Sequence, residues 1–325
     1  MENHIEYCCK ICENEKENKV FTAKEMMFGL REEFNYLECG ACGCLQIISI
    51  PPDVGKYYPE NYYSFGNIRY AYHPLKIFFK KKLIEYKVHK QKTLLGKILS
   101  FKYTQPEDFY PWLETIQPSF NAKILDVGCG SGNLLLKLHK SGFVDLSGVD
   151  PFIKHDISYE GGVNIRKKSL FEIDGQYDLI IFNHSLEHME DQRAIFSKVY
   201  ELLKSGGCLL IRIPLTGTYA WRTYGVNWVQ LDAPRHFYLH TPRSMEVLQN
   251  KTGFKNMKIV FDSNELQFWG SEQYIRDIPL RDPQSYAESP LKSLFTDEQI
   301  DSFRKQAQIL NAKYDGDMAC FYLYK

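Results

Sequence analysis

The chain has 325 residues, and 44% of them are apolar, which is enough for a substantial core in one large domain or two smaller ones. Forty Lys and Arg residues balance forty Asp and Glu residues, so the overall positive charge that drives non-specific nucleic-acid binding is absent. The first ten residues contain no apolar leader, and no stretch reaches the roughly 18–20 apolar residues that cross a bilayer. We therefore expect a cytoplasmic protein, in a reducing compartment where disulfides are rare.

The cysteines are concentrated near the N-terminus. Six of the nine lie before residue 45, which marks residues 1–50 as a separate module. Two Cys-x2-Cys pairs stand in this module: Cys9, Cys12, Cys39 and Cys42. Four thiolates at this spacing can surround one tetrahedral ion and leave no position open, so the pattern predicts a structural Zn²⁺ site. Cys8 and Cys44 could substitute in a shifted register, and an iron–sulfur cluster or a redox dithiol remains the alternative.

A connector and a basic segment follow the module and together span residues 51–118. Pro51 and Pro52 stop any regular element, and the tyrosine-rich sequence GKYYPENYYSFG comes next. Residues 75–102 place apolar side chains at helical spacing among lysines and predict one or two helices. A solvated helix face is one interpretation of this segment, and peripheral contact with a membrane surface is the other.

Residues 119–325 read as an α/β domain, because short apolar runs alternate with helical patterns. Seven strands are expected, with the last beside the fifth and sixth: KILDV, DLSGVD, NIRKK, YDLIIFN, GCLLIRI, KNMKIVFD and MACFYLY. The connection between the fifth and sixth strands and the insertion at residues 263–317 are too long for ordinary loops. Both predict cover over a substrate site.

A glycine loop follows the first of these strands. Gly128 and Gly130 allow a sharp turn and a close approach of the backbone to a ligand at a helix N-terminus. Asp150 ends the next strand, where doubly wound folds place a carboxylate on ribose hydroxyls. Asp126 would repel a pyrophosphate but complement the cationic amino group of a methionine moiety. Asn133 replaces the third glycine of the dinucleotide motif, so the loop favours S-adenosylmethionine.

Four segments in order resemble the motifs of class I S-adenosylmethionine-dependent methyltransferases: ILDVGCGSG, GVDP, YDLIIFNHSLEHMED and ELLKSGGCLLIRIP. The resemblance covers residues 119–260 and implies a Rossmann-like, mostly parallel sheet of seven strands with an antiparallel last strand. It implies six cofactor-binding residues: Asp126, Gly128, Gly130, Asp150, Asn183 and His184. Ser169 and Leu170 stand where many members carry an acid for the adenine.

The segment after the fourth strand also has the His-x-x-Glu-His spacing of a zinc peptidase helix, with His184, Glu187 and His188. Here the segment begins at the carboxyl end of a strand, where open parallel sheets form their sites. His188 therefore either packs on the next helix or faces the substrate.

The cysteine module and the sequence YYPENYYS extend the resemblance to residues 9–64. Together they are similar to zinc-module methyltransferases among the deoxysugar C-methyltransferases and in polysaccharide gene neighbourhoods. In the sugar enzymes a connector tyrosine and a Glu-His pair lie at the substrate. Three tyrosines match the first: Tyr58, Tyr62 and Tyr63. His236 matches the second, while Arg235 stands in place of its acid and departs from the carbon-methylating pattern.

The expected activity is methyl transfer to a small-molecule or glycan acceptor, such as a nucleotide-linked or lipid-linked sugar. The expected catalytic residues are His236 as the base, with His188 and Tyr63 assisting. Packing in an aromatic loop is the alternative for His236 and His240. A zinc-ribbon RNA methyltransferase, a quinone-type O-methyltransferase and a non-enzymatic binding protein remain open as other functions.

Overall fold

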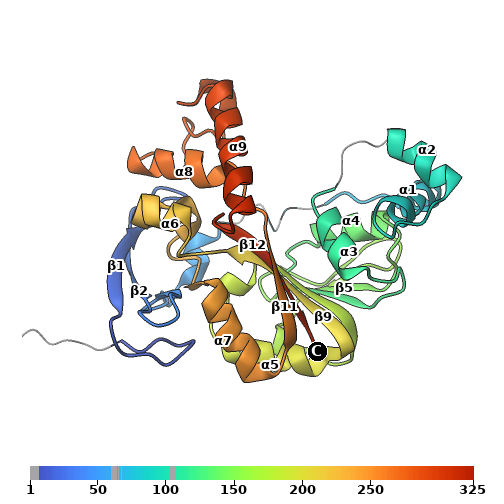
Figure 1. Ribbon diagram of the computed structural model, residues 1–325, viewed down its shortest axis with the longest axis horizontal. Coiled ribbons are helices and arrows are strands. Elements are labelled where there is room, and N and C mark those ends of the chain that lie inside the picture. Colours follow the sequence, from blue (N-terminus) through green and yellow to red (C-terminus); the bar gives the residue numbers. More distant parts are fainter. Residues whose placement is uncertain (1–6, 60–63, 65, 67, 103–106) are drawn as a thin grey trace, which may run out of the picture.

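The computed structural model describes residues 7–59, 64, 66, 68–102 and 107–325 (Figure 1). Its centre is a sheet of eight strands: β4 (Ile124–Val127), β5 (Leu146–Val149), β6 (Ile157–Ser158), β7 (Asn164–Arg166), β8 (Tyr177–Asn183), β9 (Leu203–Pro214), β11 (Lys255–Phe261) and β12 (Met318–Tyr324). The order across the sheet is β11-β12-β9-β8-β4-β5-β7-β6. β12 runs antiparallel to β9 and β11, while β4 is parallel to β5 and β8.

This topology confirms the predicted Rossmann-like fold. All seven predicted strands are present, and the last one lies between the fifth and the sixth. The eighth strand, β6, is a two-residue edge that pairs antiparallel with β7. A strand of two residues is too short to show the alternating pattern by which strands are predicted from sequence.

Helices cover both faces of this sheet, on one side α3 (Tyr110–Ile116) and α4 (Asn133–Lys140), on the other α5 (Gln192–Leu202) and α7 (Pro242–Thr252) (Figure 1). Side chains of β8 alternate between the two faces, as strand geometry requires. Ile180 and Phe182 join the core that contains α5 and α7. Leu179 and Ile181 join the core that contains α3 and α4. A strand buried on both faces reads as the continuous apolar run seen in the sequence.

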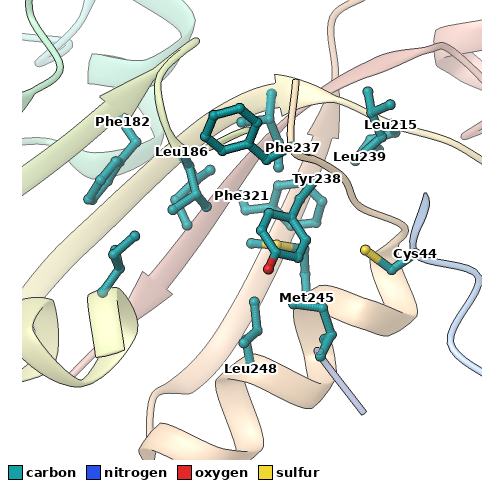
Figure 2. Close-up of a cluster of buried hydrophobic side chains, with 14 of the residues drawn as sticks. Cys44, Phe182, Leu186, Leu215, Phe237, Tyr238, Leu239, Met245, Leu248 and Phe321 are labelled. Carbon is teal, nitrogen blue, oxygen red and sulfur yellow. The ribbon is translucent and has the colours of Figure 1, made fainter. Parts of the chain in front are cut away.

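The N-terminal module contains a second, antiparallel sheet of β1 (Lys19–Lys24), β2 (Glu33–Glu38) and β3 (Leu45–Ile47). Its fourth strand is β10 (Tyr238–Leu239), which the connection between β9 and β11 supplies. Figure 2 shows the result: Cys44 of the module lies in one apolar cluster with Leu239 and with Met245 of α7. The module therefore shares a sheet and a core with the larger part of the chain, and the division at residues 50 and 118 stays a prediction.

The basic segment forms two helices, α1 (Pro74–Lys87) and α2 (Leu94–Lys102), at the edge of the molecule farthest from the module (Figure 1). Gly96 lies where the helices touch, because a Cβ there would be 2.5 Å from Cβ of Tyr86 and 3.0 Å from the carbonyl oxygen of Lys82. The contact places the start of α2 beside the end of α1. Among the described residues, no helix combines the length and the apolar character that spanning a bilayer requires.

Two insertions close over the start of β12. The first contains α6 (Tyr219–Tyr224), η5 (Gly225–Asn227) and η6 (Val229–Leu231); the second contains α8 (Leu266–Ile275), η7 (Pro290–Lys292) and α9 (Asp297–Ala312). Buried Asp317 joins them, since its carboxylate accepts hydrogen bonds from Trp228 Nε1 at 2.9 Å and Gln230 Nε2 at 2.7 Å. The remaining short helices are η1 (Val54–Tyr57), η3 (Leu170–Glu172) and η4 (Leu186–His188).

Candidate functional site

The glycine loop occupies the carboxyl end of β4, and two of its glycines are required by close contacts. Gly128 and Gly130 have φ of 72° and 52°, in the left-handed region that side chains disfavour. A Cβ on Gly128 would lie 2.5 Å from Cβ of Ser185, and a Cβ on Gly130 would lie 2.4 Å from the carbonyl oxygen of Ser64. Ser64 of the tyrosine-rich connector therefore lies against the loop. The resemblance implied a connector tyrosine at the substrate, but no local pattern indicated this contact with the loop.

Two acids support the loop from neighbouring strands. Asp150 follows β5 and accepts hydrogen bonds from the backbone N–H groups of Gly130 at 2.9 Å and Phe152 at 2.8 Å. Burial raises the pKa of Asp150, and those two hydrogen bonds partly offset the effect. Asp126 in β4 is 3% exposed. Burial and then the charge of Asp150 raise the pKa of Asp126 to about 8. A cationic group bound beside Asp126 would favour its ionised form.

The tip of β8 carries the other two residues predicted at the cofactor. Asn183 Oδ1 is buried, and it has no hydrogen-bond partner within the described part of the chain. His184 has φ of 55°, so the chain turns sharply as it leaves the strand. His184 Nε2 lies 2.6 Å from Nη1 of Arg212, which can only donate, so the ring proton sits on Nδ1. That nitrogen faces Glu187 Oε1 at 3.4 Å.

His188 and His236 meet beside the loop although 48 positions separate them in the chain, with ring centroids 4.8 Å apart. His188 Nδ1 donates to the carbonyl oxygen of Arg235, and His236 Nδ1 donates to that of Gln230, each at 2.8 Å. Tyr58 Oη lies 3.2 Å from His188 Nδ1. The tyrosine ring also stacks at 6.5 Å on Phe152, which follows Asp150. Tyr58 thus spans the cofactor side and the two histidines. Tyr62 and Tyr63 lie outside the described residues.

Electrostatics differ sharply among these groups. Burial, assisted by His188, lowers the pKa of His236 to about 4, so its imidazole is neutral at pH 7. Burial opposes ionisation of Glu187, but the contact with His184 and the nearby rings of His188 and His236 outweigh it and hold the pKa of Glu187 at about 2. The site therefore places the buried carboxylate of Glu187 near the neutral imidazole of His236.

The side chains of Arg235 and His240 form their contacts with residues other than the predicted site residues. Arg235 is fully buried and forms ion pairs with Glu25 of the N-terminal module at 2.9 Å and with Asp232 at 2.6 Å. Arg235, which replaces the acid of the sugar enzymes, thus forms a buried ion pair that joins the N-terminal module to the larger part of the chain. Buried His240 contacts Ser244 Oγ at 2.9 Å and Gln192 Oε1 at 3.2 Å, as a packing residue would.

The four cysteines of the two pairs converge in the module. Their sulfur atoms all lie within 4.8 Å of one another, with Cys9 to Cys42 at 3.7 Å and Cys12 to Cys39 at 3.4 Å. Cys8 is exposed and Cys44 is buried against the backbone, and neither belongs to the cluster. Four sulfurs at these distances match the ligand set that structural zinc sites use.

Residues 101–259 match a family model described as a methyltransferase domain. A provisionally named methyltransferase of Geobacillus sp. (strain WCH70) is 37% identical over 106 residues, which cover 29% of this chain and 43% of that protein. A ubiquinone biosynthesis O-methyltransferase of Erwinia tasmaniensis is 32% identical over 129 residues, covering 36% and 53% respectively. The chain therefore spans only about half the length of these relatives.

One solved structure is among those that align with this chain. It is a SAM dependent methyltransferase from Archaeoglobus fulgidus, which aligns with 20% identity and a TM-score of 0.41 over 70% of this chain and 99% of that one.

Proposed function

We propose that the chain, which carries a methyltransferase domain over residues 101–259, is an S-adenosylmethionine-dependent methyltransferase. One observation carries the proposal. The ends of β4, β5 and β8 bring Asp126, Asp150 and Asn183 around a loop whose glycines leave its backbone open to close approach. Sites in open parallel sheets form at these carboxyl ends.

Each of these residues has a role in cofactor binding under this proposal. Asp126 complements the cationic amino group, and the glycine loop accommodates the methionine portion. Asp150 receives the ribose hydroxyls while it also holds the loop through Gly130. Asn183 and His184 bound the same space from β8, and the unpaired Oδ1 of Asn183 offers an acceptor to a ligand N–H or O–H. Bound S-adenosylmethionine supplies a methyl group that is already electrophilic.

The acceptor side is formed by His188, His236 and the tyrosine-rich connector. In both histidines Nδ1 is occupied by a backbone carbonyl, so Nε2 has the free lone pair that a proton acceptor needs. We assign His236 as the base, with His188 and a connector tyrosine, Tyr58 or Tyr63, positioning the acceptor. A pKa near 4 keeps His236 neutral but makes it a weak base toward an ordinary hydroxyl. Efficient transfer therefore requires that a second group lower the pKa of the acceptor hydroxyl.

A small acceptor with a hydroxyl group fits this site best. The relatives named above include a ubiquinone biosynthesis O-methyltransferase, which favours oxygen as the methylated atom. The resemblance of the cysteine module and connector to those of sugar methyltransferases favours a nucleotide-linked or lipid-linked sugar as the molecule that carries this oxygen. The balance of forty basic and forty acidic residues argues against RNA.

The cysteine cluster completes the proposal as a structural Zn²⁺ site. Its four sulfurs leave no position open for a substrate. Thr241 Oγ1 donates to the carbonyl oxygen of Cys42 at 2.6 Å, and β3 pairs with β10 just after His236. A folded module therefore supports the segment that carries His236.

Transfer of a radiolabelled methyl group tests the proposal. Purified protein is incubated with labelled S-adenosylmethionine and, separately, with nucleotide sugars, lipid-linked sugars, quinols and ribosomal RNA. We expect label in one of the hydroxyl-bearing small molecules, and His236→Gln should abolish transfer while it retains cofactor binding. Label in RNA alone would contradict the assigned acceptor class, and wild-type turnover in His236→Gln would remove that residue from the mechanism.

A further inference from the structure

Three side chains with metal-binding atoms converge on the acceptor side of the proposed site. Glu187 and His188 belong to η4, directly after β8, and His236 comes from the segment before β10. One ligand atom from each lies within 4.8 Å of the other two. Small side-chain rotations would bring these atoms to the roughly 2.0–2.2 Å at which such ligands stand from a single ion.

Glu187 is the strongest sign of a missing partner. Its side chain is fully buried, and neither carboxylate oxygen has a hydrogen-bond partner in the part of the chain that the structure describes. Among the described residues, the donor that faces it is His184 Nδ1, at 3.4 Å from Oε1. Burying a carboxylate without donors is costly, so buried charges are normally paired or coordinate metals.

The two histidines are already oriented as ligands. Each donates its Nδ1–H to a backbone carbonyl at 2.8 Å, His188 to Arg235 and His236 to Gln230. Metal-binding histidines show this arrangement, because the hydrogen bond fixes the tautomer and leaves the other nitrogen free to coordinate. Asp232 Oδ2 lies 3.8 Å from His236 Nε2 and adds negative charge on the same side.

We propose that Glu187, His188 and His236 bind a divalent metal ion that takes the acceptor oxygen in an open coordination position. Two imidazoles and one carboxylate suit Mn²⁺, Fe²⁺, Co²⁺ or Zn²⁺ better than Ca²⁺ or Mg²⁺. Three protein ligands leave room for a substrate, in contrast to the closed cysteine site. The inference rests on the proposed methyltransferase function and narrows it to an oxygen acceptor.

The ion would lower the pKa of the acceptor hydroxyl, which His236 is too weak a base to deprotonate alone. The coordinated hydroxyl loses its proton to solvent, because coordination lowers the pKa of a bound O–H group. Its oxygen lone pair forms the bond to the methyl carbon, and the pair of the breaking carbon–sulfur bond stays on sulfur, which becomes a neutral thioether. With the ion bound, His236 serves as one of its ligands and no longer as the base assigned under the proposed function, because coordination uses its Nε2 lone pair.

Titration with Mn²⁺ tests the site, because this ion prefers oxygen and nitrogen donors and leaves the cysteine cluster aside. Free Mn²⁺ is measured by electron paramagnetic resonance in the presence of full-length protein. We expect one ion per chain in the wild type and at least about 10-fold weaker binding in Glu187→Gln. Glu190→Gln, which alters an exposed acid three positions away, is the matched control and should bind as the wild type does.

Binding of S-adenosylmethionine, measured on the same samples, separates the two proposals. If the wild type and Glu187→Gln both bind the cofactor while neither Mn²⁺ nor Co²⁺ is retained, the metal site is wrong and the methyltransferase proposal stands. Equal Mn²⁺ affinity in Glu187→Gln and the wild type would also overturn the site. Absence of cofactor binding in the wild type would contradict the proposed function itself.

A second inference comes from the hairpin of α1 and α2. Apolar side chains stand exposed on both helices: Leu75, Phe78, Phe79, Leu94, Ile98 and Phe101. Leu75, Leu94 and Phe101 are each exposed by 75% or more. Exposed lysines flank them, among them Lys76, Lys97 and Lys102. Large apolar side chains beside lysines at the rim of a molecule are the composition of a membrane-surface helix.

We infer that this hairpin rests on an anionic lipid surface. The lysines would face the headgroups and the apolar side chains would enter the headgroup region, in keeping with the nine lysines and single glutamate of residues 76–102. An acceptor carried on a lipid would then be delivered to the same surface on which the enzyme docks.

Sedimentation with vesicles tests the inference. We expect full-length protein to pellet with vesicles containing phosphatidylglycerol, to pellet little with pure phosphatidylcholine, and to be released by high salt. Ile98→Ser with Phe101→Ser should reduce binding by at least about 10-fold, since both side chains are exposed in the folded protein. If the double variant pellets as much as the wild type, the hairpin of α1 and α2 is not the lipid-binding surface. Absence of pelleting together with concentration-dependent dimers that the variant abolishes would assign it to a second copy of the chain.

Discussion

Replacement of Arg235 by Met tests whether the N-terminal module and the larger part of the chain fold as one unit. The guanidinium is fully buried and pairs with Glu25, which is also fully buried, and with Asp232. Met keeps much of the apolar stem but leaves the Glu25 carboxylate, within the described part of the chain, with two donors, the backbone N–H groups of Phe28 and Leu30. Breaking a buried pair in this way costs about 3–5 kcal/mol.

The expected change in melting temperature follows from the size of the chain. An unfolding entropy of about 2.1 cal/mol/K per residue corresponds to about 0.7 kcal/mol/K for this protein, so Arg235→Met should lower the melting temperature by about 4–7 °C. Adding Glu25→Gln to Arg235→Met should restore part of the loss, because the uncompensated charge is gone.

Differential scanning calorimetry measures both effects. Asp277→Asn is the matched control, because the ion pair of Asp277 with Arg31 joins the same two parts at the exposed surface, and its loss should leave the melting temperature within error. Two results would contradict a stabilising Arg235–Glu25 pair: a melting temperature of Arg235→Met equal to that of the wild type, or strictly additive losses in the double variant.

Three further predictions concern the loop, a buried histidine and the cysteine cluster. Gly130→Ala should weaken cofactor binding by at least about 10-fold in calorimetric titration, because its Cβ would lie 2.4 Å from the carbonyl oxygen of Ser64; unchanged affinity would count against the loop. Burial lowers the pKa of His240 to about 4, below its ordinary value of 6.5, so its contribution to stability is complete above about pH 6.5 and is lost as the pH falls toward 4. The wild type should therefore lose about 2 kcal/mol more than His240→Gln between pH 7.5 and 5.0 in urea unfolding, and equal losses would contradict this. Thiol-reactive displacement should release one Zn²⁺ per chain, Cys39→Ser should bind none, and Cys8→Ser should bind as the wild type does, whereas loss of Zn²⁺ in Cys8→Ser would contradict the ligand set.

Local features of this fold could be predicted from the sequence. The strand before Gly128 is a short apolar run, the glycines mark the turn, and Asp150 follows one strand later, so each signal lies within a few residues of the structure it announces. The positions of β11 and β12 in the sheet were expected from the count of seven strands and from the resemblance to class I methyltransferases.

Long-range pairings could not be predicted in this way. Glu25 and Arg235 are separated by 210 positions, and β10 has only two residues, so neither leaves a periodic pattern. His188 and His236 were expected in one site from the sequence, but nothing in it indicated that Glu187 would lie beside both. Such contacts are decided by packing across the whole molecule.

The most direct test of the central claim is cofactor binding to full-length protein by isothermal titration calorimetry. We predict that S-adenosylmethionine binds with one site per chain and that Asp150→Asn weakens binding by at least about 10-fold, since a hydrogen bond to a charged group contributes about 1.5–3 kcal/mol. Asp145→Asn, an exposed acid just before β5, should bind as the wild type does. No binding by the wild type, or equal affinity in Asp150→Asn, would contradict the assignment of this site.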